Sequence, residues 1–385
     1  MKNQNRENEN VLENLEPEKT SELERKKTIY VPDHDVIAYG KASKEEKESE
    51  ISVDEYKFDN EKSQKKNLAT KLKKFFNSVI PKKTDSVKTI IIKCVSIVAA
   101  LGILASGSYL IYYFVDISAQ NSVISGARTT YNLNRDDYSV NDAGEFSKFE
   151  ALKAQNSDIV GWISIEGTDV DNPVYQTDNN DFYITHDMNK QSNSYGSLFL
   201  DYRCDINRLS VTQNQIIYGH NMRYGAMFGS LKNYRDLEFY KQKPIIKFDS
   251  LFDSMSYKIF AVMIVNTTSD NTFGYDFSAY RTNFLTQEDF LTWAEQCKAH
   301  SLIDTPVDVK SGDEIITLST CCYDFTDARL VIVARRVRNG ESTEVDVNSA
   351  VMNDDVLYTK EYYDKKKLPI PSVEAPTASI YEEEK

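Results

Sequence analysis

The amino-acid sequence predicts a mainly β fold: a closed β-barrel with helical insertions, preceded by one transmembrane helix. Three observations support this prediction. Between residues 138 and 337, short runs rich in Val, Ile, Phe and Tyr are separated by clusters of Asn, Asp, Gly or Ser, as strands are separated by turns. Helical spacing occurs in two stretches of that region, too few for alternating β and α units. Upstream of it, one long apolar stretch carries no charge.

The membrane-spanning segment is predicted at residues 94–115, CVSIVAALGILASGSYLIYYFV. These 22 uncharged residues are enough for one helix to cross a bilayer. A secretory signal peptide fits less well, because the stretch begins far from the N-terminus and is longer than the usual apolar core. Nine lysines and one acid occupy residues 65–93, whereas no Lys or Arg follows the stretch until Arg128. We therefore expect a cytoplasmic N-terminus, an extracellular main domain, and contact with membrane lipid through residues 65–115.

The other segments differ in composition. Residues 1–64 are dominated by Glu, Lys, Asn and Ser and are expected to form a disordered cytoplasmic tail, because they cannot bury enough apolar surface to fold. Residues 65–93 form a basic juxtamembrane segment, and residues 116–139 a linker to the folded domain at residues 140–338, which is long enough for one sizeable core. Residues 339–385 are acidic and contain prolines, which suggests a flexible C-terminal extension. The net charge of −13 argues against a nucleic-acid partner.

Seven strands and two helices are predicted in the folded domain. The strands are expected at residues 160–165, 197–202, 215–218, 245–248, 257–266, 314–321 and 329–337. The helices are expected at residues 146–154 and 286–300. In the second helix, Thr286 is the expected N-cap and Asp289 an acid in the first turn. Its buried face is expected to hold Phe290, Trp293, Ala294 and Cys297.

The most informative motif is Thr-Leu-Ser-Thr-Cys at residues 317–321, which ends one of these strands. Alternation along the strand places Ser319 and Cys321 on one face and Thr320 and Cys322 on the other. Only one of the two adjacent cysteines can therefore face a given cleft.

Two further residues complete a candidate site. His220 follows a predicted strand and opens a polar, glycine-containing loop, and Arg329 begins the strand after Cys321 as a charge at the end of an apolar stripe. A thiolate is a nucleophile, an imidazole supplies or accepts a proton, and a permanently charged guanidinium can bind carbonyl groups and stabilise an oxyanion. The three residues therefore suggest thiol-based acyl transfer. Asp324 and Asp327, in the loop after Cys321, leave a Cys-His-Asp arrangement as an alternative.

Each of these residue types also has a purely structural interpretation. A lone cysteine is usually a small buried hydrophobe, which applies to Cys297 on the helix face and to Cys94 in the apolar stretch. Cys204 could be a free surface thiol or form a disulfide with Cys297. His300, at the end of a helix, is expected to act as a C-terminal charge. No Cys/His cluster in the sequence has zinc-ligand spacing, so neither a metal nor a cofactor is expected.

On these motifs the chain resembles the sortases, the membrane-anchored cysteine transpeptidases of Gram-positive bacteria, and specifically class B. Residues 317–321 look like the sortase Thr-Leu-x-Thr-Cys signature, and Arg329 matches the family's arginine. Residues 217–222, Ile-Tyr-Gly-His-Asn-Met, look like the class B histidine segment. Residues 158–163 and 196–202 continue the match, which covers residues 140–337.

The resemblance implies a sortase-type β-barrel in which Cys321 attacks the Thr carbonyl of a sorting signal and forms a thioester. His220 would protonate the departing amine and then deprotonate the incoming one, and Arg329 would hold the sorting peptide and stabilise the oxyanion. Positions that line the class B substrate groove are matched by Asn180, Tyr218, Ser319 and Thr320. The implied partners are surface proteins that carry a sorting signal and an amine of the peptidoglycan precursor, so that surface proteins are anchored to the cell wall.

Several alternatives stay open at this point. The acceptor could be a lysine of a pilin, which would make the chain a pilin-polymerising sortase. The chain could instead be a membrane-anchored β-barrel that binds peptides without turnover. If water took the acyl group, the chain would be a thiol protease, that is, a hydrolase. Cys322 stands where class B members more often carry another residue, so a regulatory disulfide is a further alternative.

Overall fold

The computed structural model describes residues 70–71, 74, 78–267 and 281–372. The predicted cytoplasmic tail at residues 1–64 lies outside these residues, as do residues 373–385. The chain divides into two compact units, residues 1–97 and 98–385, and the predicted folded domain belongs to the second.

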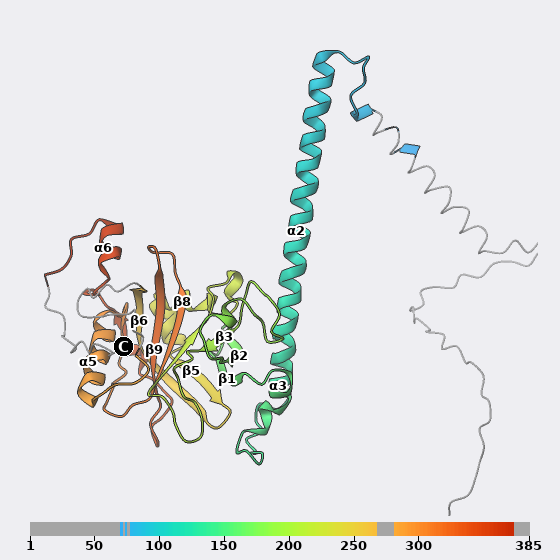
Figure 1. The fold of residues 1–385 in the computed structure, drawn as a ribbon. Coiled ribbons are helices and arrows are strands. Elements are labelled where there is room, and N and C mark those ends of the chain that lie inside the picture. Colours follow the sequence, from blue (N-terminus) through green and yellow to red (C-terminus); the bar gives the residue numbers. More distant parts are fainter. Residues whose placement is uncertain (1–69, 72–73, 75–77, 268–280, 373–385) are drawn as a thin grey trace, which may run out of the picture. The chain divides into compact units, whose positions relative to one another are not determined.

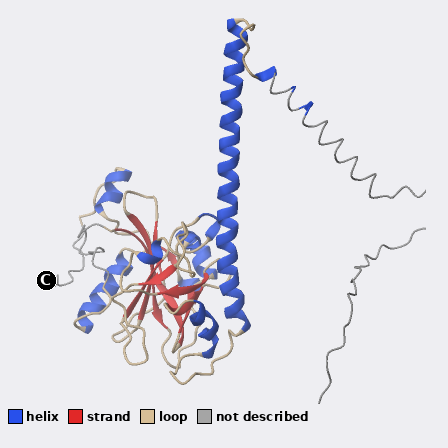
Figure 2. Cartoon of the chain, turned by 45° about the vertical axis from the view of Figure 1, so that its right-hand side comes forward, coloured by secondary structure: helices blue, strands red, loops and turns tan. Residues whose placement is uncertain are grey.

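Eight strands of the described residues close into a barrel in the hydrogen-bonded order β1-β2-β3-β4-β8-β9-β6-β5 (Figures 1 and 2). Their bounds are β1 Ile159–Ser164, β2 Asp171–Tyr175, β3 Leu198–Leu200, β4 Asn214–Tyr218, β5 Ile245–Ser250, β6 Ser254–Asn266, β8 Ile315–Cys321 and β9 Ala328–Arg336. This arrangement confirms the predicted closed β-barrel with helical insertions. All seven predicted strands are present, and β2 is an additional strand that was not predicted.

The pairing of β4 with β8 determines where the candidate residues meet. It is parallel, and its register runs from Asn214 opposite Ile315 to Tyr218 opposite Ser319. Because parallel strands end at the same edge of a sheet, the residues after β4 and the end of β8 lie at one edge of the barrel. Strand β9 then pairs antiparallel with β8 and begins at that same edge.

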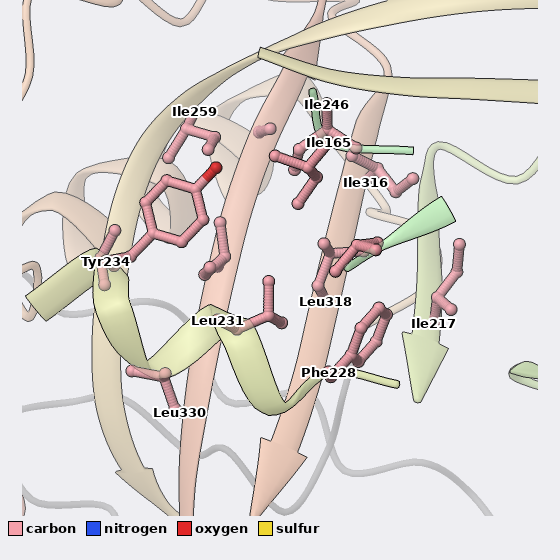
Figure 3. Close-up of a cluster of buried hydrophobic side chains, with 14 of the residues drawn as sticks. Ile165, Ile217, Phe228, Leu231, Tyr234, Ile246, Ile259, Ile316, Leu318 and Leu330 are labelled. Atoms are coloured by element: carbon pink, nitrogen blue, oxygen red, sulfur yellow. The ribbon is translucent and has the colours of Figure 1, made fainter. Parts of the chain in front are cut away.

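The barrel interior is filled by a single cluster of apolar side chains (Figure 3). Ile316 and Leu318 of β8 and Leu330 of β9 belong to it, and each is fully buried. Leu231 and Tyr234, on the 3-10 helix Gly229–Arg235, pack against these strands (Figure 3). The interior cluster therefore fixes one face of β8 and β9, and the alternate residues must point outward.

Helix α5 (Gln287–Ala299) covers this outer face. Thr286 caps it as predicted, because its hydroxyl oxygen accepts a hydrogen bond from the backbone N–H of Asp289 at 3.1 Å. The predicted apolar face is also confirmed, with buried side chains at Phe290, Trp293, Ala294 and Cys297.

His300, directly after the helix, is 2% exposed, and burial lowers its pKa to about 4, so it is neutral at pH 7. The expectation that His300 acts as a C-terminal charge is therefore wrong.

Helix α2 (Val87–Leu133) contains the predicted membrane-spanning stretch. Its part Val87–Val115 is, among the described residues, the one helical segment long and apolar enough to cross a membrane. The helix then continues through most of the expected linker at residues 116–139. There Tyr131 is buried, and its ring stacks on Trp162 with centroids 4.2 Å apart. The expected linker is thus largely a helix that packs on the barrel.

The remaining helices are short. The helix predicted at residues 146–154 is present as a 3-10 turn, Ser147–Phe149, followed by α3 (Glu150–Gln155). Helix α4 (Leu237–Gln242) was not predicted; Asp236 caps it through a 2.9 Å hydrogen bond from the backbone N–H of Phe239. Further 3-10 turns lie at Phe182–Ile184, Arg223–Gly225 and Val347–Ser349.

The segment after the barrel is ordered where the structure describes it. Strand β10 (Val351–Met352) pairs antiparallel with β7 (Ile303–Asp304), and α6 (Lys360–Lys366) follows. Leu357 and Tyr363 are buried. The expected flexible extension is therefore incorrect for residues 339–372, because apolar and aromatic side chains among the acids dock on the domain.

Candidate active site

Cys321 is the last residue of β8, and Arg329 lies directly opposite it in β9. The guanidinium of Arg329 donates a hydrogen bond through Nη1 to the sulfur of Cys321. Both side chains project from the outer face of the barrel, which the interior cluster defines. The cysteine sulfur therefore sits beside a fixed positive charge at the edge of the sheet.

His220 reaches the same edge from β4. Gly219 extends the parallel pairing, because its N–H donates to the carbonyl of Ser319 at 3.2 Å. A Cβ at Gly219 would lie 2.3 Å from a methyl carbon of Leu198 and 2.8 Å from the ring of Phe228, so any larger residue would force these packed side chains to shift. Nε2 of His220 is 2.8 Å from the carbonyl oxygen of Ile184 and donates to it in the corresponding tautomer.

The loop after His220 is tied to the cysteine itself. The side-chain amide of Asn221 donates to the backbone carbonyl of Cys321 at 2.9 Å. This bond joins the histidine loop to the end of β8, and Asn221 was not singled out as a functional residue from the sequence. Its position directly after His220 in the motif is the feature of the sequence that could have indicated a role for Asn221 in the site.

A cleft of about 300 Å³ brings the predicted residues together. Its lining includes Cys321, His220 and Arg329, with Asn180, Tyr218 and Ser319 beside them. Thr320 is absent from the lining; it is 1% exposed and lies between two residues that face the cleft side of β8. The expectation that its side chain lines the groove is incorrect, because strand alternation turns it to the opposite face.

A buried carboxylate, Asp201, supports one wall of this cleft. It lies directly after β3, and its side chain is 0% exposed. Oδ2 accepts hydrogen bonds from the hydroxyl of Tyr218 at 2.8 Å and from the amide of Asn180 at 3.1 Å. Arg203 donates to both carboxylate oxygens at 3.0 Å. Burial opposes ionisation, but the hydrogen bonds from Arg203 and Tyr218 outweigh it and hold the pKa of Asp201 below its usual range.

Comparison with known proteins identifies the family. The Sortase domain profile matches residues 163–337. Sortase B of Staphylococcus aureus is 34% identical over 193 residues, which cover 50% of this chain and 75% of that protein. Sortase B of Listeria monocytogenes is 33% identical over 219 residues, which cover 56% of this chain and 84% of that protein. The chain belongs to the sortase family, class B.

Solved structures of sortases agree with this assignment. The Staphylococcus aureus sortase B–substrate complex has a TM-score of 0.51 and 29% identity, with 58% of this chain and 99% of that chain covered. Sortase B from Bacillus anthracis in complex with AAEK2 has a TM-score of 0.51 and 32% identity, with 58% and 98% covered. This sortase therefore shares both the barrel and the transpeptidase family of these proteins.

The second cysteine of this sortase has a different environment from the first. Cys322 is 8% exposed and belongs to the interior cluster. Burial, followed by the neighbouring carboxylate of Asp324, raises the pKa of the Cys322 thiol to about 12. All five cysteines are free, so neither a disulfide through Cys322 nor the alternative Cys204–Cys297 bridge is present in this structure.

The alternative Cys-His-Asp arrangement is not formed by Asp324. Its carboxylate is held by the guanidinium of Arg235 through hydrogen bonds of 3.0 and 2.5 Å. Asp327 turns the loop at a positive φ of 59°, and its carbonyl accepts from Thr267. Within residues 78–267 and 281–372, no group of three or more His, Cys, Asp and Glu side chains is placed to hold a metal ion.

Proposed function

We propose that this sortase cleaves a sorting signal through a thioester on Cys321 and transfers the new carboxyl end to an amine. The observation that carries the proposal is the contact between the Arg329 guanidinium and the Cys321 sulfur in a cleft that also holds His220. A nucleophile, a proton carrier and a fixed cation are the groups that amide cleavage by a thiol requires.

In the first half of the reaction, the sulfur of Cys321 attacks the carbonyl carbon of the scissile peptide bond. The carbonyl oxygen becomes an oxyanion, and the Arg329 guanidinium stabilises it by charge and hydrogen bonding. The C–N bond then breaks, His220 gives its proton to the departing amine, and the acyl group stays on sulfur as a thioester.

In the second half, an incoming amine attacks the thioester carbon, and His220 takes up the proton that this amine loses. The C–S bond breaks, the sulfur leaves with its electron pair, and a new amide bond forms. The other groups of the cleft, Asn180, Tyr218 and Ser319, would contact the sorting peptide. Thr320 would contribute through its backbone and not through its buried side chain.

The apolar helix suits an acceptor that is itself held at a membrane. With its basic flank in the cytoplasm and the barrel outside, the enzyme would share a surface with a lipid-linked peptidoglycan precursor. Tethering both reactants to one surface raises their effective concentration without any new contact. The resulting activity is the anchoring of surface proteins to the cell wall.

The test uses the full-length chain in detergent with a panel of fluorogenic sorting-motif peptides. Each peptide is offered alone, with triglycine, which a related sortase B has been crystallised with, and with a lysine-bearing peptide. We expect amine-dependent ligation product by mass spectrometry, lost in Cys321→Ala and kept in the matched control Cys322→Ala. Ligation to lysine alone would indicate pilin polymerisation. Cleavage with no ligation would indicate a protease, and no thioester with any peptide would indicate a binding protein.

A further inference from the structure

We propose that Asp201 is the positioning residue of the substrate groove in this sortase, and that it acts through Asn180 and Tyr218. The proposal rests on the proposed function, since it concerns how the same cleft holds its peptide. Asp201 itself is buried and does not line the cleft, whereas both of its partners do. Its role is therefore to hold the groups that meet the peptide.

The geometry shows three separate segments joined by one carboxylate. Asn180 lies in the loop after β2, Tyr218 ends β4, and Asp201 follows β3. Oδ2 of Asp201 accepts from the Asn180 amide at 3.1 Å and from the Tyr218 hydroxyl at 2.8 Å. The loop after β2 has no ladder to hold it at Asn180, so these side-chain bonds fix its position against the strands.

Asn180 is oriented from both ends of its amide. The Nδ2 group donates to Asp201, and Oδ1 accepts from the backbone N–H of Tyr202 at 3.0 Å. An amide held in this way cannot rotate by half a turn without losing both bonds, because donor and acceptor would be exchanged. The face that Asn180 presents to the cleft is thereby set by Asp201 and its neighbour Tyr202.

Arg203 makes the buried charge tolerable. It donates to Asp201 from its backbone N–H at 2.9 Å and from Nε and Nη2 at 3.0 Å each. A buried carboxylate is stable only when it is paired and fully hydrogen-bonded. The Arg203 side chain is 37% exposed, so its guanidinium can return to water when the partner charge is removed.

An isosteric amide at position 201 would break this arrangement while keeping its volume. In Asp201→Asn, one of the two carboxylate oxygens becomes an NH₂ group, which cannot accept a hydrogen bond. At Oδ1 that group would face two donors of Arg203, and at Oδ2 it would face the donors of Asn180, Tyr218 and Arg203. The variant therefore tests the hydrogen bonds of Asp201 without changing the volume of the side chain.

A matched control exists outside the cleft. Asp249 also accepts from a tyrosine hydroxyl, that of Tyr131, and from a buried cation, Lys148 at 2.7 Å. It lies away from the cleft and does not line it. Asp249→Asn also removes a largely buried carboxylate. Because the Lys148 side chain is fully buried and loses its partner charge, thermal stability should fall at least as far as in Asp201→Asn, without a change in how the peptide is bound.

The experiment measures kcat and KM for cleavage of the best sorting-motif peptide by the full-length chain. For Asp201→Asn we expect KM to rise about tenfold, as when one charge-assisted hydrogen bond is lost, with kcat nearly unchanged. For Asp249→Asn both constants should stay at wild-type values. Tyr218→Phe combined with Asp201→Asn should raise KM by less than the product of the single effects, because both changes break the same network.

Two results would overturn the positioning role: an unchanged KM in Asp201→Asn, or an equal rise in Asp249→Asn. The second result would show that loss of stability alone explains the change. The turnover of the wild-type chain tests the proposed function separately. A failure of that function is therefore seen in the wild type and is distinct from a failure of the Asp201 proposal.

Discussion

Cys321 and Arg329 are direct cross-strand partners, and the Arg329 guanidinium donates to the Cys321 sulfur. The pairing register of β8 and β9 therefore places the positive charge of Arg329 beside the candidate nucleophile, and no loop has to move to bring it there. Interior residues on β8 and β9, such as Leu318 and Leu330, are fully buried and hold this register. A one-residue slip would turn the sulfur into the core, so the packing of the barrel also protects the site.

The first prediction concerns the geometry of the cation. Arg329→Lys keeps the positive charge but replaces a planar fork of donors with one ammonium group. Cleavage of the sorting peptide should fall by about a hundredfold or more in kcat/KM, the scale of losing an oxyanion donor. Steady-state fluorescence assays measure the loss, and thermal unfolding checks that the fold is kept. Wild-type activity in Arg329→Lys would show that charge alone suffices.

The second prediction separates the adjacent cysteines. Burial raises the pKa of Cys322 to about 12, so this thiol is protonated and poorly reactive at pH 8. Iodoacetamide at pH 8 should modify Cys321, which lines the cleft, and leave Cys322 intact when the chain stays folded. Peptide mapping by mass spectrometry reads out both sites. Labelling of the two at equal rates would contradict the assigned environments, and denatured chain provides the control in which both react.

The third prediction is a pH dependence of stability that comes from His300. Burial lowers its pKa to about 4 in the folded chain, below the ordinary value of 6.5. Between these values the unfolded chain binds a proton that the folded chain does not, so this stability is present above pH 6.5 and is lost as pH falls toward 4.

The expected slope is up to about 1.4 kcal/mol per pH unit in the free energy of unfolding. Urea denaturation at pH 7.0 and 5.0 measures it. His300→Gln cannot be protonated and should lose less stability over this interval than the wild type. Identical pH profiles for the two proteins would rule out His300 as the source.

The fourth prediction tests the docking of α2 on the barrel. Tyr131 is 1% exposed and stacks on Trp162, so Tyr131→Ala should lower the free energy of unfolding by about 3–5 kcal/mol. Tyr131→Phe keeps the ring and loses only the hydroxyl bond to Asp249, with a cost of about 1–3 kcal/mol. Chemical denaturation of the full-length chain followed by tryptophan fluorescence compares them. Leu209→Ala, at a position 96% exposed, should be neutral.

Local pattern was sufficient for most of the barrel but not for β2. Its sequence, Asp-Asn-Pro-Val-Tyr, reads as a turn, because Asn and Pro are rare in strands. In the structure Pro173 lies opposite Trp162 in the pairing with β1, and the pairing with β3 is confined to Val174 and Tyr175. The ladder with β3 thus does not need the missing N–H of Pro173. Whether a strand tolerates a proline depends on which of its residues pair with the neighbouring strands, and this cannot be predicted from the sequence of the strand alone.

The sequence motifs predicted the catalytic residues of the candidate site, but they did not predict the buried residues that hold the side chains of the cleft in place. Cys321, His220 and Arg329 stand in recognisable contexts, and the structure places them in one cleft. Asp201, by contrast, looks in the sequence like an ordinary polar residue near the end of the strand predicted at residues 197–202. Its burial arises from partners in three segments, which no local periodicity reveals. The same limit explains the C-terminal segment, where Tyr363 is buried although most residues of its helix are charged.

The parallel pairing of β4 with β8 also determines when the cleft around the Cys321 sulfur is assembled during folding. Asn221 and Cys321 are 100 positions apart in the chain and meet only through this pairing. Contacts between such distant segments require a long loop to close, which costs chain entropy and slows folding. A chain without this pairing carries the same thiol but lacks the cleft that the proposed reaction needs. The rate of turnover of a purified sample should therefore be proportional to its fraction of natively folded molecules.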